Sequence, residues 1–398
     1  MPQAGALKLS RSQDIVPLRA GPAGRHVVDV TLLFAPTSGG VRRYLLAKHE
    51  WLTRYSRLKH TVLVPGPRDA GLPHGIVSFG SPALPFGQGY RVPLRMHAFH
   101  ETLARLRPDL IEVGDPYHLA GPSLKVAHER GIPAVAFCHS DVATLARSLL
   151  GRRAGRAAGR YLADLYARFD LVLAPSHVVA ERLHGIGVRN VEVQTLGVDI
   201  ATFHPGARDP ELRGMLGIPR EARLLVFAGR LSPEKHVGDL VAALRLLGPR
   251  YHLLLIGSDR FGTRAPDVTA LPYQQDDRQL ARLLASCDVF VHAGDQETFG
   301  LVVLEAMACG LSVVAARAGA LPELVDNSVG ATFEPRVAED LAWRVRLQFE
   351  RDRAALGRAA RARAEAHGWD VAFTRLLGRY SKLMAPQVMT QRPVERVR

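Results

Sequence analysis

Two glutamates with a short turn between them are the most informative chemical feature of the sequence. Glu297 and Glu305 are separated by seven residues, and a helix-forming run at 301–308 begins directly after Gly300. The start of a helix presents unpaired N–H groups and a positive dipole end, both of which favour a phosphate. Carboxylates beside that point can accept hydrogen bonds from sugar hydroxyls. The stretch predicts a site for a sugar-bearing diphosphate; a buried helix with two incidental acids is the alternative.

Two cations follow an apolar run that we expect to be a strand at 224–228. Arg230 and Lys235 lie on either side of Pro233, which stands where the first turn of a helix tolerates proline. Fixed cations at the edge of a sheet can neutralise a diphosphate leaving group without a metal ion. The chain contains no Asp-x-Asp sequence, which would indicate a metal-held nucleotide sugar. We therefore expect no required metal and no cofactor. Two solvated surface cations are the alternative.

The elements that must position these residues are short apolar runs alternating with amphipathic helices. This alternation predicts an α/β fold of doubly wound domains with parallel sheets. Proline and glycine interrupt it at 203–206, where we place a domain join. The expected strands are 26–34, 60–64, 110–113, 134–138, 171–174 and 191–194 before the join, and 224–228, 252–256, 268–270, 289–292, 312–315 and 331–333 after it.

Two strand ends in the first half also carry candidate site residues. Gly39 and Gly40 follow the first strand and allow backbone to approach a ligand there. The dinucleotide-binding pattern of three glycines is missing, which disfavours a Rossmann oxidoreductase. His139 follows the predicted strand 134–138 and would face the other domain, either as a site residue or as a polar cap. Asp141 is expected to cap the next helix.

Together these segments resemble the family 4 retaining glycosyltransferases, which have the GT-B fold. The resemblance rests on the Glu-x7-Glu stretch, on Gly-Arg-Leu-Ser-Pro-Glu-Lys at 229–235 and on His-Ser-Asp at 139–141. It covers roughly residues 27–384. It implies two doubly wound Rossmann-like domains that face each other across a cleft, with a last helix that crosses back to the first domain.

The resemblance also implies how the chain is divided. We expect a disordered extension at 1–24 and an acceptor-side domain at 25–204. A nucleotide-sugar-binding domain would follow at 205–370. The crossover helix and a basic tail would occupy 371–398.

The implied activity is transfer of a hexose, mannose or glucose, from a nucleoside diphosphate sugar to a hydroxyl. GDP-mannose and UDP-glucose are the leading donors, and lipid-linked, oligosaccharide and small-molecule acceptors all remain open. Front-face displacement is favoured, because no carboxylate is assigned as a covalent nucleophile. The expected catalytic residues are His139, Glu297, Arg230 and Lys235. The expected donor-binding residues are Gly39, Gly40, Gly257, Tyr273, Thr298, Phe299, Gly300, Leu301 and Glu305.

The sequence departs from the family pattern at two points. Pro272 replaces a usual glycine beside the base, and His292-Ala293 replaces a usual Pro-Ser pair. Two other hypotheses stay open, and these departures support the second of them. One is a GT-B nucleotide-sugar epimerase or phosphorylase, and the other is a non-catalytic subunit that binds a nucleotide sugar.

The strongly basic composition bears on partners and location. The net charge is +14, from 52 Lys and Arg against 38 Asp and Glu. The chain has no zinc-finger spacing or RNP-like motif, so nucleic acid is not expected. Basic amphipathic stretches at 41–60 and 147–168 predict either an anionic membrane surface or a solvated helix face.

We expect a cytoplasmic protein that is soluble or peripheral on the inner face of the membrane. No segment has 18 uninterrupted apolar residues, and the N-terminus lacks a signal-peptide core. Cys138, Cys287 and Cys309 are far apart and flanked by apolar residues, as expected for reduced thiols.

Overall fold

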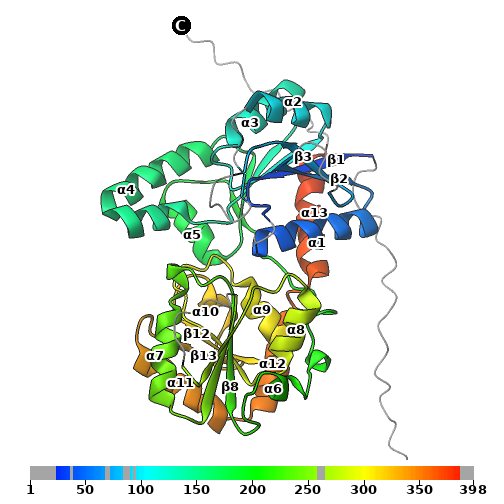
Figure 1. The fold of residues 1–398 in the computed structure, drawn as a ribbon. Coiled ribbons are helices and arrows are strands. Elements are labelled where there is room, and N and C mark those ends of the chain that lie inside the picture. The colour runs from blue at the N-terminus through cyan, green and yellow to red at the C-terminus, as the bar shows by residue number, and fades with distance from the viewer. Residues whose placement is uncertain are drawn as a thin grey trace, which may run out of the picture.

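The computed structural model describes residues 24–35, 39–67, 72–83, 90, 91, 93, 96–257 and 265–385. The chain forms two α/β bodies, one stacked on the other (Figure 1). The first holds a seven-stranded sheet in the order β3-β2-β1-β4-β5-β6-β7, and the second a six-stranded sheet in the order β10-β9-β8-β11-β12-β13. The neighbouring strands in both sheets pair in parallel. The GT-B architecture expected from the sequence is therefore confirmed.

The first body is built from residues before the predicted join. Its strands are β1 (His26–Thr31), β2 (Lys59–Gly66), β3 (Ile76–Gly80), β4 (Leu110–Gly114), β5 (Ala134–Phe137), β6 (Leu171–Ala174) and β7 (Val191–Val193). Its helices are α1 (Gly40–Tyr55), α2 (Met96–Arg105), α3 (Ala120–Arg130), α4 (Val142–Tyr166) and α5 (His177–Gly185).

The second body follows the join. Its strands are β8 (Arg223–Ala228), β9 (Tyr251–Ile256), β10 (Val268–Leu271), β11 (Val289–His292), β12 (Ser312–Ala316) and β13 (Gly330–Phe333). Its helices are α6 (Leu212–Met215), α7 (Val237–Leu247), α8 (Asp277–Ala285), α9 (Leu301–Ala308), α10 (Leu321–Leu324), α11 (Ala338–Glu350) and α12 (Arg353–Glu365), with 3₁₀ turns η1 (Pro205–Ala207) and η2 (Pro233–Lys235).

The sheets are covered on both faces, which explains the continuous apolar runs in the sequence. All of the residues of β4, β5, β6 and β11 are buried. A parallel strand packed by helices on both sides has no solvated face, so its sequence does not alternate. The carboxyl ends of both sets of strands are directed toward the interface between the two bodies, where the candidate site lies.

The final helix, α13 (Trp369–Leu383), returns to the first body and crosses beside α1 (Figure 1). Tyr380 Oη donates a hydrogen bond of 2.5 Å to Glu112 of β4. Trp51 of α1 donates through Nε1 to Asp370, at 2.7 Å. This is the crossover helix that the resemblance predicted. The tail at 386–398 and the extension at 1–23 lie outside the described residues.

The structure corrects the sequence interpretation of the first helix and its surroundings. Strand β3 was not predicted, because it is a short run between glycines. The helical pattern at 41–60 predicts a helix that is too long at its C-terminal end. Helix α1 stops at Tyr55, and β2 begins at Lys59. Leu58, which fitted the helical spacing, lies in the intervening loop and is buried.

The prediction that the basic residues of this helix form one exposed face is also partly wrong. Lys48 is completely buried, where its Nζ lies 2.8 Å from both Asp29 and Glu112. Its position follows from helical geometry, because Tyr44, Lys48 and Leu52 are spaced four residues apart and share the core face. A buried ammonium group is tolerated when carboxylates neutralise it.

Candidate active site

A cavity of about 200 Å³ lies between the two bodies and collects most of the predicted donor-site residues. It is bounded by the N-terminus of α1, the turn after β8 and the first turns of α9. The predicted residues along it are Gly39, Gly40, Arg230, Lys235, Tyr273, Glu297, Leu301 and Glu305. Segments up to 266 positions apart in sequence, from Gly39 to Glu305, thus meet in one place.

Glu297 is held by two basic side chains. Lys235 Nζ forms an ion pair with Glu297 Oε1, and His292 Nε2 lies 3.0 Å from the same oxygen. The N–H of Gly294 donates to His292 Nδ1 at 3.2 Å, which directs the Nε2 atom of the ring toward the carboxylate. Burial would raise the pKa of Glu297, but Lys235 and His292 outweigh it and lower that pKa well below its usual range. Glu297 is therefore ionised.

Glu305 is held from the opposite domain. Arg43 of α1 forms an ion pair with Glu305, and its second guanidinium nitrogen lies 2.8 Å from Asp277. Burial raises the pKa of Glu305 to about 7 despite the opposing effect of Arg43. Its Oε2 atom is buried and has no hydrogen-bond partner in the described part of the chain. That oxygen is available to accept a ligand hydroxyl.

The N-terminus of α9 has the geometry of an anion site. Gly300 precedes it with φ of 96°, and no side chain caps the first turn. The positive φ favours glycine, and a Cβ at this position would lie 3.1 Å from Leu321 Cδ2, which would have to shift slightly. The helix begins with free N–H groups beside Leu301, which lines the cavity.

The glycine pair of the first body closes over this helix. A Cβ at Gly39 would lie 3.8 Å from Tyr273 Oη, and one at Gly40 would lie 3.6 Å from Leu301 Cδ2. Tyr273 and Leu301 both belong to the second body. The Gly-Gly turn therefore brings first-domain backbone against the donor side of the cavity.

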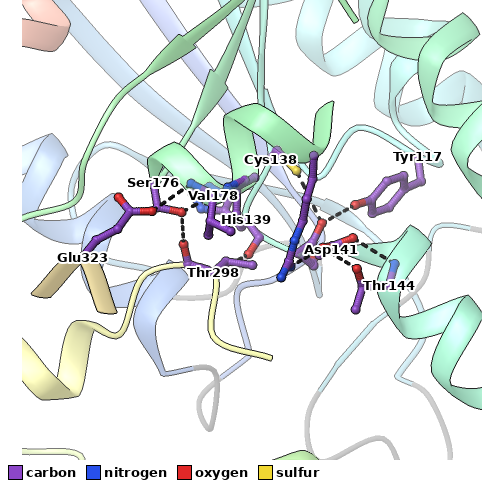
Figure 2. Close-up of polar contacts among 12 residues, drawn as sticks. Tyr117, Cys138, His139, Asp141, Thr144, Ser176, Val178, Thr298 and Glu323 are labelled. Carbon is purple, nitrogen blue, oxygen red and sulfur yellow. Dashed lines mark hydrogen bonds and ion pairs between the residues drawn. The ribbon is translucent and has the colours of Figure 1, made fainter. Parts of the chain in front are cut away.

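Two predicted residues are close by but have other contacts. Thr298 Oγ1 donates to the carbonyl of His139 at 2.8 Å, while the carbonyl of Thr298 accepts from Ser176 Oγ at 2.8 Å (Figure 2). Phe299 is buried in the core of the second body. Thr298 is thus an interdomain contact, and Phe299 packs in the core and does not line the cavity.

His139 lies at the end of β5 but does not line this cavity. Its ring stacks on Phe137 with 4.2 Å between centroids and meets Tyr44 edge-on. Burial lowers the pKa of His139 to about 3, so its imidazole is neutral. The part of His139 that the structure places at the domain interface is its carbonyl oxygen.

Gly257 supports the site from behind. A Cβ on Gly257 would lie 1.8 Å from the carbonyl oxygen of Gly229, so the end of β9 can pack against the turn that carries Arg230 only if it is glycine. Its φ of 150° also favours glycine. Gly257 therefore shapes the turn and does not itself line the cavity.

Sequence reasoning missed several residues that organise the site. Arg43 falls within the basic stretch at 41–60 and was not predicted as a site residue. Asp115 accepts the N–H groups of His139 and Ser140, at 2.9 and 3.0 Å, and so fixes the tip after β5. Glu323 of α10 accepts the N–H groups of His177 and Val178 at the start of α5, at 2.9 and 2.8 Å (Figure 2). No local pattern in the sequence marks these contacts.

Metal binding and membrane crossing are two further properties on which the described residues bear. No group of three or more His, Cys, Asp and Glu side chains in them has an arrangement that could hold a metal ion. In the same residues, no helix has both the length and the apolar character needed to cross a bilayer.

The two facing Rossmann-like bodies and the charged cavity between them define the class of GT-B glycosyltransferases. The fold is shared with sucrose-phosphate synthase from Thermosynechococcus elongatus, at a TM-score of 0.74 and 20% identity over 91% of this chain and 99% of that one. It is also shared with Anabaena Alr3699/HepE bound to UDP and glucose, at a TM-score of 0.72 and 21% identity over 90% of this chain and 100% of that one.

The protein belongs to glycosyltransferase family 4. The family model "Glycosyltransferase Family 4" matches residues 38–202, and "Glycosyl transferases group 1" matches residues 208–363. A Mycobacterium tuberculosis (strain ATCC 25177 / H37Ra) protein, the GDP-mannose-dependent alpha-(1-6)-phosphatidylinositol dimannoside mannosyltransferase, is 34% identical over 88% of this chain and 95% of its own length. A GDP-mannose-dependent alpha-mannosyltransferase of M. tuberculosis (strain CDC 1551 / Oshkosh) is 32% identical over 90% of this chain and 96% of its own. The protein is therefore a glycosyltransferase.

Proposed function

We propose that this protein transfers mannose from GDP-mannose to an acceptor hydroxyl and retains the anomeric configuration. The observation that carries the proposal is the interdomain cavity in which Arg230, Lys235, Glu297 and Glu305 meet. Similarity to two GDP-mannose-dependent mannosyltransferases supports the choice of donor. UDP-glucose is the second donor to test.

Charge neutralisation at the leaving diphosphate is assigned to Arg230 and Lys235. Arg230 lines the cavity and has no hydrogen-bond or ion-pair partner in the described part of the chain. Lys235 is paired with Glu297, which holds its ammonium group in place. Together with the N-terminus of α9, these cations supply fixed positive charge where negative charge develops, and no metal ion is required.

Sugar recognition is assigned to the two glutamates. Glu297, kept ionised by Lys235 and His292, accepts hydroxyls of the transferred sugar. Glu305 accepts ribose hydroxyls through its unpartnered Oε2. Tyr273 and the Gly39–Gly40 backbone close the cavity around the donor.

The anomeric configuration is retained because the acceptor attacks the same face of the sugar from which the diphosphate leaves. The acceptor oxygen bonds to the anomeric carbon as the bond from that carbon to the phosphate oxygen breaks. The acceptor proton passes to the leaving phosphate. Glu297, the carboxylate closest to the leaving-group cations, is already bound to Lys235 and is assigned a binding role. Water is excluded when the domains close on the donor.

The donor site includes more than this cavity. Its volume of about 200 Å³ is below the roughly 300–1,000 Å³ usual for small-molecule sites. A neighbouring cavity of about 530 Å³ shares Gly39, Arg43, Tyr273 and Glu305 with it, and the donor is assigned to the two together.

Nucleotide binding in the presence of a metal chelator is the first test. GDP, UDP, ADP and NAD are compared by thermal stabilisation of the purified protein. We expect selective stabilisation by GDP, followed by transfer from GDP-mannose that persists in the chelator. Stabilisation by NAD alone, or by none of the diphosphates, would rule out the donor site, and an inverted product would rule out the mechanism.

A further inference from the structure

The residue that follows Lys235 has an unusual backbone conformation. His236 has φ of 47° and ψ of 43°, which is left-handed, at the join between the turn η2 and helix α7. In the described part of the chain, four residues other than glycine have a positive φ, and they are Arg107, Asp115, His236 and Arg336. A residue with a Cβ is disfavoured in this region, and such strain persists at functional sites where surrounding contacts hold it. We therefore expect the imidazole of His236 to make contacts that offset the strain.

The imidazole joins two other segments of the second body. Its Nε2 lies 2.9 Å from Asp295 Oδ2, in the loop after β11, and its Nδ1 lies 2.7 Å from Arg336 Nη1. The Nε atom of Arg336 in turn lies 3.2 Å from Asp239, in the first turn of α7. The side chain of His236 is only 13% exposed, so these contacts are made largely out of solvent. The histidine is thus held from both sides of its ring.

The contact with Asp295 lies directly beside the ion pair of the donor site. Lys235 pairs with Glu297, and the next residue, His236, contacts Asp295, two positions before that glutamate. Two adjacent contacts therefore connect the same turn to the same loop. Strands β8 and β11, which lead into these two segments, pair in parallel, so their carboxyl ends lie side by side. The sheet brings the segments together, and the two contacts fix one against the other.

A cation at the leaving group is useful only if its position is fixed. The ammonium group of Lys235 is a point charge at the end of a flexible stem, and the pair with Glu297 restrains that end alone. The contact of His236 with Asp295 restrains the backbone from which the stem extends. A misplacement of about 1 Å in an active site can lower the rate about a hundredfold. Restraint of the turn is therefore significant for catalysis as well as for folding.

We propose that His236 is a positioning residue for sugar transfer. By holding Asp295, it fixes the turn that carries Lys235, so the ammonium group stays where negative charge develops on the leaving diphosphate. Glycine would adopt the same backbone freely but has no imidazole to make the contact. The inference rests on the proposed function, and it adds to the site a residue that lines neither of the two donor cavities.

Two glycine substitutions and one conservative substitution test the inference. His236→Gly removes the imidazole and relieves the strained backbone. Arg107→Gly is the matched control, because Arg107 also has a positive φ, of 50°, and is an exposed residue of the first body. His236→Gln keeps the unfavourable φ and supplies an amide nitrogen that can donate to Asp295. The values of kcat and KM for GDP-mannose and the thermal midpoint of unfolding are measured for each protein.

We expect His236→Gly to lower kcat at least about tenfold while KM for GDP-mannose changes less than about threefold, as for lost positioning in the transition state. Its thermal midpoint should stay within about 2 °C of the wild type, because relief of the strain offsets the lost contacts. Arg107→Gly should have wild-type kinetics and a midpoint that is unchanged or higher. His236→Gln should recover at least part of the kcat that His236→Gly loses.

Three results would overturn the inference. The first is a kcat close to the wild type in His236→Gly. The second is a loss of kcat that is accompanied by a large fall in the thermal midpoint or by failure to fold, since this would show that His236 only stabilises the fold. The third is a His236→Gln variant as slow as His236→Gly, since the contact with Asp295 would then have no part in the rate.

Stabilisation of the wild type by GDP separates this failure from failure of the proposed function. Wild-type protein that GDP does not stabilise would refute the donor site, and the role of His236 with it. Wild-type protein that GDP stabilises, together with a His236→Gly variant that turns over normally, would refute the role of His236 alone.

Discussion

At the scale of single residues, Arg230 is the clearest test of the site because it lines the donor cavity and has no hydrogen-bond or ion-pair partner in the described part of the chain. We expect Arg230→Ala to lower kcat for transfer from GDP-mannose at least about tenfold, as for loss of one preorganised charge at the leaving group. Steady-state assays in chelator measure it. Arg220→Ala, at an exposed arginine of the same body, is the control and should be neutral. Near-wild-type turnover in Arg230→Ala would refute the role.

Glu305 should give donor binding a pH dependence. Burial raises its pKa to about 7, so the side chain is mostly protonated below that pH and ionised above it. An ionised carboxylate accepts the stronger hydrogen bond, so affinity for GDP-mannose should weaken a few-fold between about pH 8 and pH 6. Glu305→Gln cannot ionise and should bind with a flatter profile across this range. Identical profiles for the two proteins, measured by calorimetry, would contradict the assignment.

The limits of sequence reasoning are also clearest at these residues. Glu297, Glu305, Arg230 and Lys235 could be selected because each pair lies within one short segment, where spacing fixes geometry. The Arg43–Glu305 ion pair joins residues 262 positions apart. Such a contact depends on how two domains pack, which no local pattern encodes.

At the scale of elements, α13 is fixed to the first body by a buried polar network. Tyr380 Oη donates to Glu112, whose other oxygen lies 2.8 Å from Lys48. Tyr380→Phe removes that donor and leaves a buried carboxylate oxygen unsatisfied, which should cost about 1–3 kcal/mol of stability. The shift in a urea transition followed by tryptophan fluorescence measures it. Tyr161→Phe removes a hydroxyl that donates at 3.3 Å from a half-exposed side chain, and it should change stability far less. Equal shifts would argue against the network.

The same elements show which parts of the fold a sequence can predict. Strand positions were predicted well, since a strand buried on both faces must be apolar throughout. The end of α1 was not, because Leu58 continues the apolar spacing after the helix has stopped. The burial of Lys48 was missed because a charged residue on the core face contradicts the usual pattern, although its spacing from Tyr44 placed it there.

At the scale of the whole molecule, the carboxylate of Glu323 in the second body contacts the N-terminus of α5 in the first body, beside the site. Glu323 of α10 accepts the N–H groups of His177 and Val178, where the dipole of α5 also favours negative charge. Such a contact contributes about 0.3–2 kcal/mol, which is enough to change the population of closed molecules several-fold. Glu323→Ala should therefore favour the open arrangement while each body stays folded.

Opening should alter the reaction in a specific way. In Glu323→Ala we expect a larger radius of gyration by X-ray scattering, a KM for GDP-mannose raised a few-fold and a larger share of donor lost to water, because closure excludes solvent from the reacting sugar. Glu339→Ala removes an exposed glutamate from the first turn of α11 and is the matched control. A variant that scatters like the wild type and partitions its donor identically between acceptor and water would show that Glu323 does not hold the domains closed. Since Thr298 and Ser176 form the adjoining contact, Ser176→Ala added to Glu323→Ala should increase both effects.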